Sequence, residues 1–227
     1  MENYPVVLLN TVLSPLSFLL LIAFVSRGQL IGEAIEGGFI MSMFQSGMSL
    51  QGDLAHLKND FKLQDMVVSS PTSPAAYVAG MALAEVIYSM PALAVLAVLA
   101  AIYIHPGIAQ ALQLLGVFLL MFLASVALGY TLSTFSSDIV QSFAFSRLIS
   151  TLFSTLPPVY YPITLIPLPF RYLAYLSPTT YAAEISQNTT GLLPLSSLGF
   201  ALAWGVLFST TGFLALIAVK KARWREV

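Results

Sequence analysis

The 227-residue chain contains no cysteine and few charged residues. Without cysteine it can form no disulfide, no thiolate metal site and no cysteine nucleophile. Charged residues make up 8% of the sequence, and the formal net charge is -1. The charges are scattered or locally mixed in sign, so they indicate neither nucleic-acid binding nor a general polybasic attraction to anionic lipid.

Hydrophobic residues, by contrast, make up 58% of the chain, and its mean hydropathy is +0.87. Soluble domains are about 45 to 50% apolar, so this composition indicates an integral membrane protein. No stretch between the apolar runs is long enough for a soluble domain. The first run, Val6 to Val25, is about twice as long as a signal-peptide core and lacks a basic flank and a cleavage site. We interpret it as a retained span.

Six segments have, or nearly have, the length and hydropathy of membrane-crossing helices, which need about 20 apolar residues for roughly 30 Å of hydrocarbon. Ser73-Pro74 is typical of a helix start, and Pro15 and Pro91 predict kinks inside two spans. We therefore predict an all-α integral membrane protein, a single domain over residues 1–227 with six transmembrane helices. The predicted spans are approximately 6–25, 31–50, 75–104, 108–135, 139–156 and 195–219.

The basic residues predict the orientation of these spans. Six crossings put both termini on one face of the membrane, together with loop 53–74 and the loop at Ser136. The opposite face holds only Arg27 and Arg171. By the positive-inside rule the termini are cytoplasmic, and we expect a multi-pass protein of the cell membrane. The basic residues on the cytoplasmic face are Lys58, Lys62, Lys220, Lys221, Arg223 and Arg225.

Residues 157–194 form the external link between the fifth and sixth predicted spans. The link contains seven prolines and is nevertheless apolar and aromatic. Proline interrupts a spanning helix, and a solvated loop would be more polar. Re-entrant external helices that dip into the outer leaflet agree with both properties, provided that protein or a cavity buries their broken backbone.

Motifs for catalysis and nucleotide binding are missing. The chain has no G-x-x-x-x-G-K-[ST] sequence, so it cannot bind nucleotide phosphates in a P-loop. Its only histidines, His56 and His105, fall on opposite sides of the predicted membrane, and we expect neither a metal site nor a cofactor in this chain. Any energy from ATP would have to come from another protein.

Four ionisable residues fall inside the predicted spans, where each costs several kcal/mol unless it is paired, hydrated or snorkelled. Glu33 and Glu36 lie in the first turns of the second span, and we expect them at the outer interface, where a helix N-terminus favours carboxylates. Glu85 and Arg147 enter from the cytoplasmic side at similar depth. They pair, or face an inward-open cavity, or Arg147 snorkels to the interface.

Methionine and aromatic side chains dominate the second and fifth spans. Such a flexible apolar lining suits a hydrophobic or amphipathic substrate. Contacts with lipid or between helices explain the same composition equally well. The candidate pathway residues are Phe39, Met43, Phe44, Phe145, Leu152 and Phe153.

A short polar segment, Asp53 to Asp65, which we call the polar island, gathers five charged residues and His56 between apolar runs. We predict a short amphipathic helix near the membrane surface. Its two lysines and three aspartates nearly cancel, so docking into a protein groove explains it better than attraction to lipid headgroups. One stripe of the helix would contain Leu54, Leu57 and Phe61, and another Lys58, Lys62 and Asp65.

Two passages resemble the permease subunit of ABC-2 type transporters, which are ATP-binding-cassette exporters. The first is DFKLQDMVVSSPTSP at 60–74 with YVAG at 77–80, and it is similar to the coupling-helix loop and the start of the third span. The second is YPITLIP at 161–167 with LSPTTY at 176–181, and it is similar to the aromatic and proline-rich external segment. With six spans in matching order, the resemblance covers essentially the whole chain.

The resemblance implies partners. The polar island would be a cytoplasmic coupling helix in a cleft of a separate ATPase subunit, which carries the P-loop and binds ATP and Mg. Two permease chains, identical or related, would assemble with two ATPases in the lipid membrane, and the second and fifth spans would border the central pathway. The implied contact residues are Asp53, Leu54, His56, Leu57, Lys58, Asp60, Phe61, Lys62 and Asp65.

The resemblance also implies an outer gate in the segment after Pro157, with Tyr160, Tyr161, Pro162 and Tyr181 as its residues. Family members usually begin with a cytoplasmic amphipathic helix, whereas only Met1 to Tyr4 precede the first apolar run here.

We expect a permease subunit that exports a hydrophobic or amphipathic compound by alternating access and performs no chemistry itself. The alternative is an ion-gradient-driven secondary transporter with Glu85 and Arg147 as its relay. Such transporters often contain inverted repeats, and the sequence shows no convincing one. A non-transporting membrane scaffold is a third interpretation, supported only by the partner-binding character of the polar island.

Overall fold

The computed structural model describes residues 4–59, 73–135, 139–155 and 157–221, and within these ranges the only regular secondary structure is helical. The all-α prediction is therefore confirmed for the described residues. The long helices are α1 (Tyr4–Val25), α2 (Ile31–Asn59), α4 (Pro74–Tyr103), α5 (Ile108–Phe135), α6 (Ile139–Thr155) and α9 (Ser197–Lys221). The short ones are η1 (Ile163–Leu165), α7 (Phe170–Ala174) and α8 (Pro178–Thr189).

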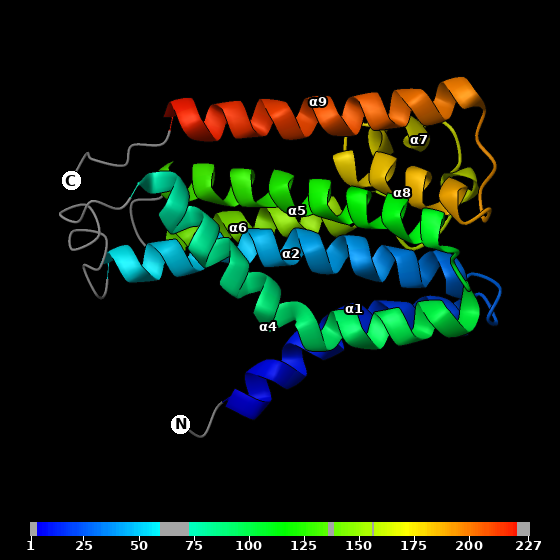
Figure 1. Cartoon of the computed structure of the whole chain (residues 1–227), viewed down its shortest axis with the longest axis horizontal. Coiled ribbons are helices and arrows are strands. Elements are labelled where there is room, and N and C mark those ends of the chain that lie inside the picture. Colours follow the sequence, from blue (N-terminus) through cyan, green and yellow to red (C-terminus); the bar gives the residue numbers. More distant parts are fainter. Residues whose placement is uncertain (1–3, 60–72, 136–138, 156, 222–227) are drawn as a thin grey trace.

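The ends of the long helices follow local sequence signals. The Ala76 N–H donates to the Ser73 hydroxyl oxygen at 3.2 Å, so Ser73 caps α4 as predicted. Figure 1 shows that α1 and α4 bend, and these are the two helices with an interior proline, Pro15 and Pro91. Proline removes one backbone hydrogen bond and clashes with the preceding turn, which explains both bends.

Helix α2 differs from the prediction, because it does not end at residue 50 but continues to Asn59. Its last turns contain the first part of the polar island, Asp53 to Asn59. This part is therefore the end of a spanning-length helix, and the prediction of a separate surface helix is wrong for it. Gly52 is the only break signal, and one glycine costs a helix about 1 kcal/mol, which is too little to stop it. Asp60, Phe61, Lys62 and Asp65 lie outside the described residues.

Three of the long helices are clearly long and apolar enough to cross a membrane. They cover Ala76–Tyr103, Ile108–Thr134 and Ser197–Lys220, and shorter apolar stretches lie at Leu16–Val25 and Phe143–Phe153. Large apolar side chains on these helices are exposed, such as Ile108 at 85% and Val219 at 82%. Exposed apolar surface of this kind suits hydrocarbon and not water.

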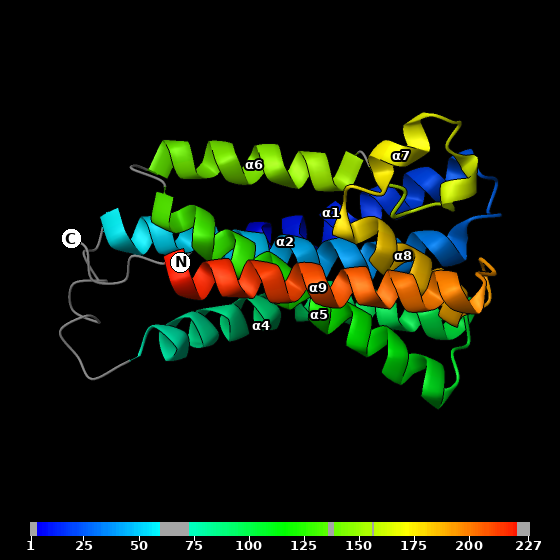
Figure 2. The ribbon, with the colours of Figure 1, turned by 90° about the horizontal axis from the view of Figure 1, so that it is seen from above.

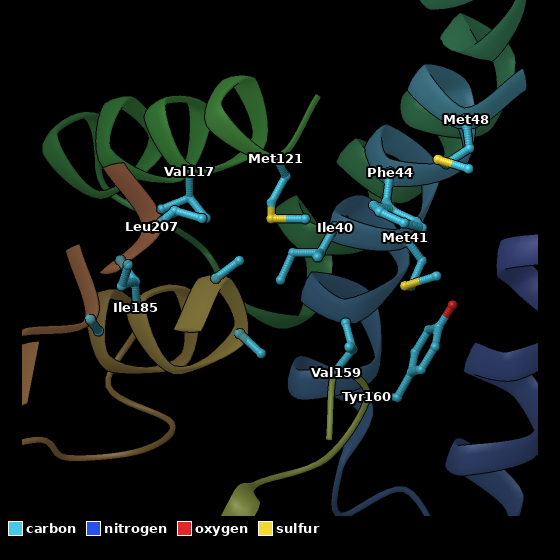
Figure 3. Packing of buried hydrophobic residues seen from close by; sticks show 13 residues of the cluster. Ile40, Met41, Phe44, Met48, Val117, Met121, Val159, Tyr160, Ile185 and Leu207 are labelled. Carbon is cyan, nitrogen blue, oxygen red and sulfur yellow. The ribbon is translucent and has the colours of Figure 1, made fainter. Parts of the chain in front are cut away.

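Helix α2 is the centre of the bundle and contacts α1, α4, α5, α6 and α8. Its tightest neighbour is α5, where Gly47 and Gly129 allow the two backbones to approach closely. The largest apolar cluster lies around α2 and joins Phe44 to Met121 of α5, Ile185 of α8 and Leu207 of α9 (Figure 3). The N-terminal end of α1 and the C-terminal ends of α2 and α9 lie at the same end of the bundle (Figures 1 and 2).

The segment from Pro157 to Leu195 packs at the opposite end of the bundle, where α8 contacts α2, α5 and α9 (Figure 2). Side chains satisfy several of its carbonyl groups. Arg171 Nη2 donates to the carbonyl oxygens of Thr164 and Ile166, both at 3.0 Å. The Thr180 hydroxyl donates to the carbonyl oxygen of Ala174 at 2.5 Å. This is how an interrupted backbone remains satisfied in apolar surroundings.

Candidate functional site

The C-terminal end of α2 is the first part of the candidate site. Asp53 is exposed, whereas Leu54 is buried against the bundle. His56, Leu57 and Lys58 belong to the last turns of the same helix. Because the helix is continuous, a displacement of this end would reach the core residues of α2 directly.

A row of polar side chains joins this end of α2 to α4. The hydroxyl groups of Ser46 and Ser89 bond to each other, and Ser89 donates to the Glu85 carbonyl oxygen at 2.8 Å. The buried Glu85 side chain forms hydrogen bonds with Asp53 and with Ser49. Two carboxyl groups share a hydrogen bond only when one of them carries a proton. The contact therefore ties α4 to the first residue of the polar island.

Arg147, the partner that the sequence suggested for Glu85, lies elsewhere. It is exposed on α6 and lines a cavity of about 430 Å³ together with Phe143, Ser146 and Ser150. The structure thus gives Glu85 the partners Asp53 and Ser49 in place of Arg147. Ser46 and Ser49 lie one turn apart on α2, and nothing in the sequence identifies them as partners of α4.

The candidate pathway residues do not share one surface of the chain. Phe44 stacks on Phe153 of α6 with ring centroids 5.1 Å apart, so these two lie together between α2 and α6. Phe39 stacks on Phe118 of α5 at 4.9 Å, and Met43 packs against α4 and α5.

On α6, Phe145 and Leu152 are exposed. Phe44 and Phe153 therefore meet between α2 and α6, Phe145 and Leu152 lie on the exposed surface of α6, and Phe39 and Met43 lie on the side of α4 and α5. Phe39 there lines a second, mostly apolar cavity of about 490 Å³, bordered by α4 and α5.

The candidate gate residues pack against the half of the bundle that contains the N-terminal end of α2. Tyr160 is buried and stacks on Phe18 of α1 at 5.3 Å, and Figure 3 shows its ring beside Met41 of α2. Pro162 is buried, and Tyr161 is half-buried. A Cβ at Gly37 would lie 2.5 Å from the Val159 carbonyl oxygen, so only glycine allows this segment to approach α2 so closely.

Tyr181, the fourth candidate gate residue, packs against Tyr175 with ring centroids 5.7 Å apart. The Tyr175 hydroxyl donates to Glu184 Oε1 at 2.9 Å. Burial raises the pKa of Glu184, and the bond from Tyr175 partly lowers it again. Burial, followed by this bond, raises the pKa of Tyr175 to about 12. The sequence analysis did not identify the Tyr175–Glu184 pair.

Glu33 and Glu36, which we expect at the outer interface, are buried inside the bundle. They are 6% and 1% exposed. The Thr190 hydroxyl, just after α8, donates to Glu36 Oε1 at 2.6 Å. The end of α8 covers these turns of α2, which only the tertiary structure could reveal.

The chain is thus a helical bundle with membrane-length apolar helices and a central helix, α2, that runs from a covered N-terminal end to the polar island. A family model described as ABC-2 type transporter matches residues 3–190, which is most of the chain. The chain belongs to the ABC-2 type transporter family. No curated protein matches it.

Membership of the ABC-2 type transporter family makes this chain an integral membrane permease. The membrane domain of this family is a transport subunit, not itself catalytic, and it generally pairs with an ATPase subunit. The match covers both passages that carried the resemblance in the sequence, residues 60–80 and 161–181.

Proposed function

We propose that this chain is the permease subunit of an ABC-2 exporter, which moves a hydrophobic or amphipathic compound outward by alternating access. One structural observation carries the proposal beyond family membership. Helix α2 is a single element from the outer segment, through the largest core cluster, to the polar island. It is therefore the element through which a partner at its inner end would act on the outer end.

In this proposal all six long helices cross the cell membrane, with both termini in the cytoplasm. Helices α2 and α6 are less apolar than α1, α4, α5 and α9. Most of the polar groups of α2 are buried inside the bundle, such as Glu36, Ser42 and Ser46. A helix that places its polar groups against other helices can cross a bilayer with a lower mean hydropathy.

A separate ATPase subunit would supply the energy and would bind ATP and Mg. The polar island, Asp53 to Asp65, would be the contact with this subunit. Closure of the ATPases favours the outward-open state only if they contact the polar island differently in the two states. The Asp53–Glu85 hydrogen bond would pass this displacement from α2 to α4.

A second permease chain would complete the pathway. The exposed side of α6, with Phe145, Leu152 and Arg147, would face this chain and the substrate. Tyr160, Tyr161, Pro162 and Tyr181 would belong to the outer gate, because they connect the external segment to the core around α2. The apolar character of the α6 side suits a hydrophobic or amphipathic substrate.

Reconstitution with the cognate ATPase tests the proposal. We would measure ATP hydrolysis and export in proteoliposomes for the variant that combines Lys58→Glu, Lys62→Glu and Asp65→Lys. We expect the variant to fold normally and to lose ATP-driven export. Lys220→Glu is the matched control, since it produces the same net change of charge near the end of α9, and it should keep export. Export by the triple variant at the wild-type rate would refute the coupling role.

The Asp53–Glu85 pair also supports a second candidate, a proton-driven transporter, because a shared proton is what a relay needs. The two candidates predict opposite results in vesicles. A proton-driven transporter works without the ATPase and stops when the proton gradient is collapsed. An ABC-2 exporter requires ATP and its partner, and it continues after the gradient is collapsed.

A further inference from the structure

The first turns of α2 and the C-terminal end of α8 meet in a buried cluster of oxygen atoms. The Thr190 hydroxyl oxygen lies 2.6 Å from Glu36 Oε1, 3.1 Å from the Ser186 carbonyl oxygen and 3.4 Å from the Gln187 carbonyl oxygen. A hydroxyl group has one hydrogen, so it can satisfy only one of these three acceptors fully. The cluster is therefore rich in acceptors and poor in hydrogens.

Further unsatisfied oxygens lie beside it. Glu33 precedes Glu36 by three residues, so the two carboxyl groups are neighbours on the surface of α2. Both are more than nine-tenths buried, and within the described residues no donor reaches Oε2 of either.

Helix α8 contributes two more unsatisfied groups. Ser186 and Gln187 lie one turn before Thr190. They are therefore on the same face of α8 as Thr190, whose side chain contacts Glu36. Both are at least 99% buried, and Ser186 Oγ and Gln187 Nε2 have no hydrogen-bond partner in the described part of the chain. The Gln187 amide can turn to offer its oxygen in place of its nitrogen.

The electrostatics of this cluster call for positive charge. The C-terminal end of a helix carries a partial negative charge, and the end of α8 lies against Glu36. A buried carboxylate without a partner costs several kcal/mol. Arg171, the basic residue of the external segment, donates to the carbonyl oxygens of Thr164 and Ile166.

We propose that Glu33, Glu36, Thr190, Ser186 and Gln187 form a binding site for a small hard cation. Hard cations such as Na⁺ and Ca²⁺ bind several oxygens at once, from carboxylates, hydroxyl groups, amides and backbone carbonyls, and this cluster contains all four kinds. A proton would neutralise one carboxyl group and satisfy one further acceptor, which leaves the others unmatched. The cluster offers no thiolate or imidazole, so it does not suit a soft transition metal.

A cation at this position would join two parts of the chain that are far apart in sequence. Glu33 and Glu36 belong to the central helix, and Thr190 ends the external segment at α8. Binding would hold the end of α8 against α2 and so stabilise the fold. This inference does not depend on the proposed coupling to an ATPase.

Thermal unfolding of the purified full chain in detergent tests the site. We would compare melting temperatures in choline chloride, in sodium chloride and in choline chloride with added calcium chloride, at equal ionic strength. We expect Na⁺ or Ca²⁺ to raise the melting temperature of the wild type by about 2–4 °C. The arm that produces the rise identifies the cation as monovalent or divalent, and either result supports the site.

Three variants locate the effect. Glu36→Gln should abolish the cation-dependent rise, and Thr190→Val should reduce it. The matched control is Glu184→Gln, which changes another buried carboxyl group of α8 that already has a partner in Tyr175, and it should keep the rise. If Glu36→Gln does not fold, Glu33→Gln and Thr190→Val still decide the question.

Three results would overturn the inference. The first is a melting temperature that does not differ between the salts. The second is a rise that acidification produces in choline chloride while Na⁺ and Ca²⁺ add nothing, which would mean that a proton neutralises the cluster. The third is an equal loss of the rise in Glu184→Gln. None of these results bears on ATP-driven export, so the two proposals fail separately.

Discussion

Glu85 on α4 forms a side-chain hydrogen bond with Asp53, the first residue of the polar island on α2. Glu85→Ala should destabilise the protein by about 0.5–1.5 kcal/mol, because it removes the buried Glu85 side chain together with its hydrogen bonds to Asp53 and Ser49, which are themselves exposed. Glu85→Gln should be much milder, since its amide can donate to the Asp53 carboxylate. Urea unfolding in mixed micelles, with each variant compared with the wild type, measures both effects.

Arg147→Gln is the control for this prediction. Arg147 is exposed on α6, and we expect its replacement to change stability by less than about 0.5 kcal/mol. Equal destabilisation by Arg147→Gln and Glu85→Ala would mean that the two residues depend on each other, contrary to the structure.

The close approach of α2 and α5 predicts a second effect. A Cβ at Gly129 would lie 2.7 Å from the Gly47 carbonyl oxygen, and that oxygen belongs to backbone that cannot move aside easily. Gly129→Val should therefore destabilise the fold by about 1–3 kcal/mol or more, because overpacking separates the two helices. Melting temperature and yield in detergent measure the loss.

Gly80→Ala is the matched control, because a Cβ at Gly80 meets nothing within 4 Å. Alanine favours a helix over glycine by about 1 kcal/mol, so this variant should be unchanged or slightly more stable. A stable Gly129→Val protein would contradict the backbone contact between α2 and α5.

The stacked rings of Phe44 and Phe153 predict coupled behaviour. Phe44→Ala should cost about 3–5 kcal/mol, because Phe44 is 2% exposed in the largest core cluster. In a double-mutant cycle with Phe153→Ala, the coupling energy should be about 0.5–1.5 kcal/mol, the range measured for aromatic pairs. Unfolding of the four proteins under the same conditions gives this energy.

Phe213→Ala serves as the comparison for that cycle. Phe213 is exposed on α9, and its cycle with Phe153→Ala should show no coupling beyond about 0.5 kcal/mol. Strict additivity of Phe44→Ala and Phe153→Ala would show that the two rings do not pack on each other.

Glu184 predicts a pH dependence with a definite sign. Burial raises its pKa in the folded chain, so the folded state holds this proton more tightly than the unfolded state does. Its contribution to stability is therefore greatest at low pH and decreases as the pH rises from the ordinary carboxyl pKa to the raised one. Glu184→Gln, which keeps an acceptor for Tyr175, should show a flatter dependence of melting temperature on pH than the wild type.

Tyr175→Phe provides the opposite change. It removes the hydrogen bond that lowers the pKa of Glu184, so the decrease of stability should extend to higher pH than in the wild type. Identical pH profiles for all three proteins would show that Glu184 is not in the buried environment that the structure describes.

The sequence predicted the helices well because each depends on local signals. The run of apolar residues between Ser73-Pro74 and His105-Pro106-Gly107 is sufficient to define α4, whose observed bounds are Pro74–Tyr103. The predicted end of α2 at residue 50 is wrong, because the sequence becomes polar there while the helix continues to Asn59. A helix can continue through charged residues as long as its backbone hydrogen bonds continue, and no proline interrupts them there.

The sequence could not predict which side chains on different helices form hydrogen bonds with each other. Glu36 and Thr190 are separated by 154 residues, and no periodicity links them. The same holds for the polar row between α2 and α4, since a serine in a span is equally compatible with lipid, water or a neighbouring helix. Pairing of Glu85 with Arg147 was one of three alternatives, and it rested on the attraction of opposite charges without knowledge of which helices are neighbours.

The sequence alone therefore determined the class of the protein, its helices and, through two local passages, its resemblance to ABC-2 permeases, because hydropathy, proline positions and short motifs are properties of contiguous residues. Only the tertiary structure decided that α2 is central, that Glu33 and Glu36 are buried beneath the end of α8, and that Asp53 bonds with Glu85. These are consequences of packing, in which glycines such as Gly47 and Gly129 set the distances between helices and so choose which side chains meet.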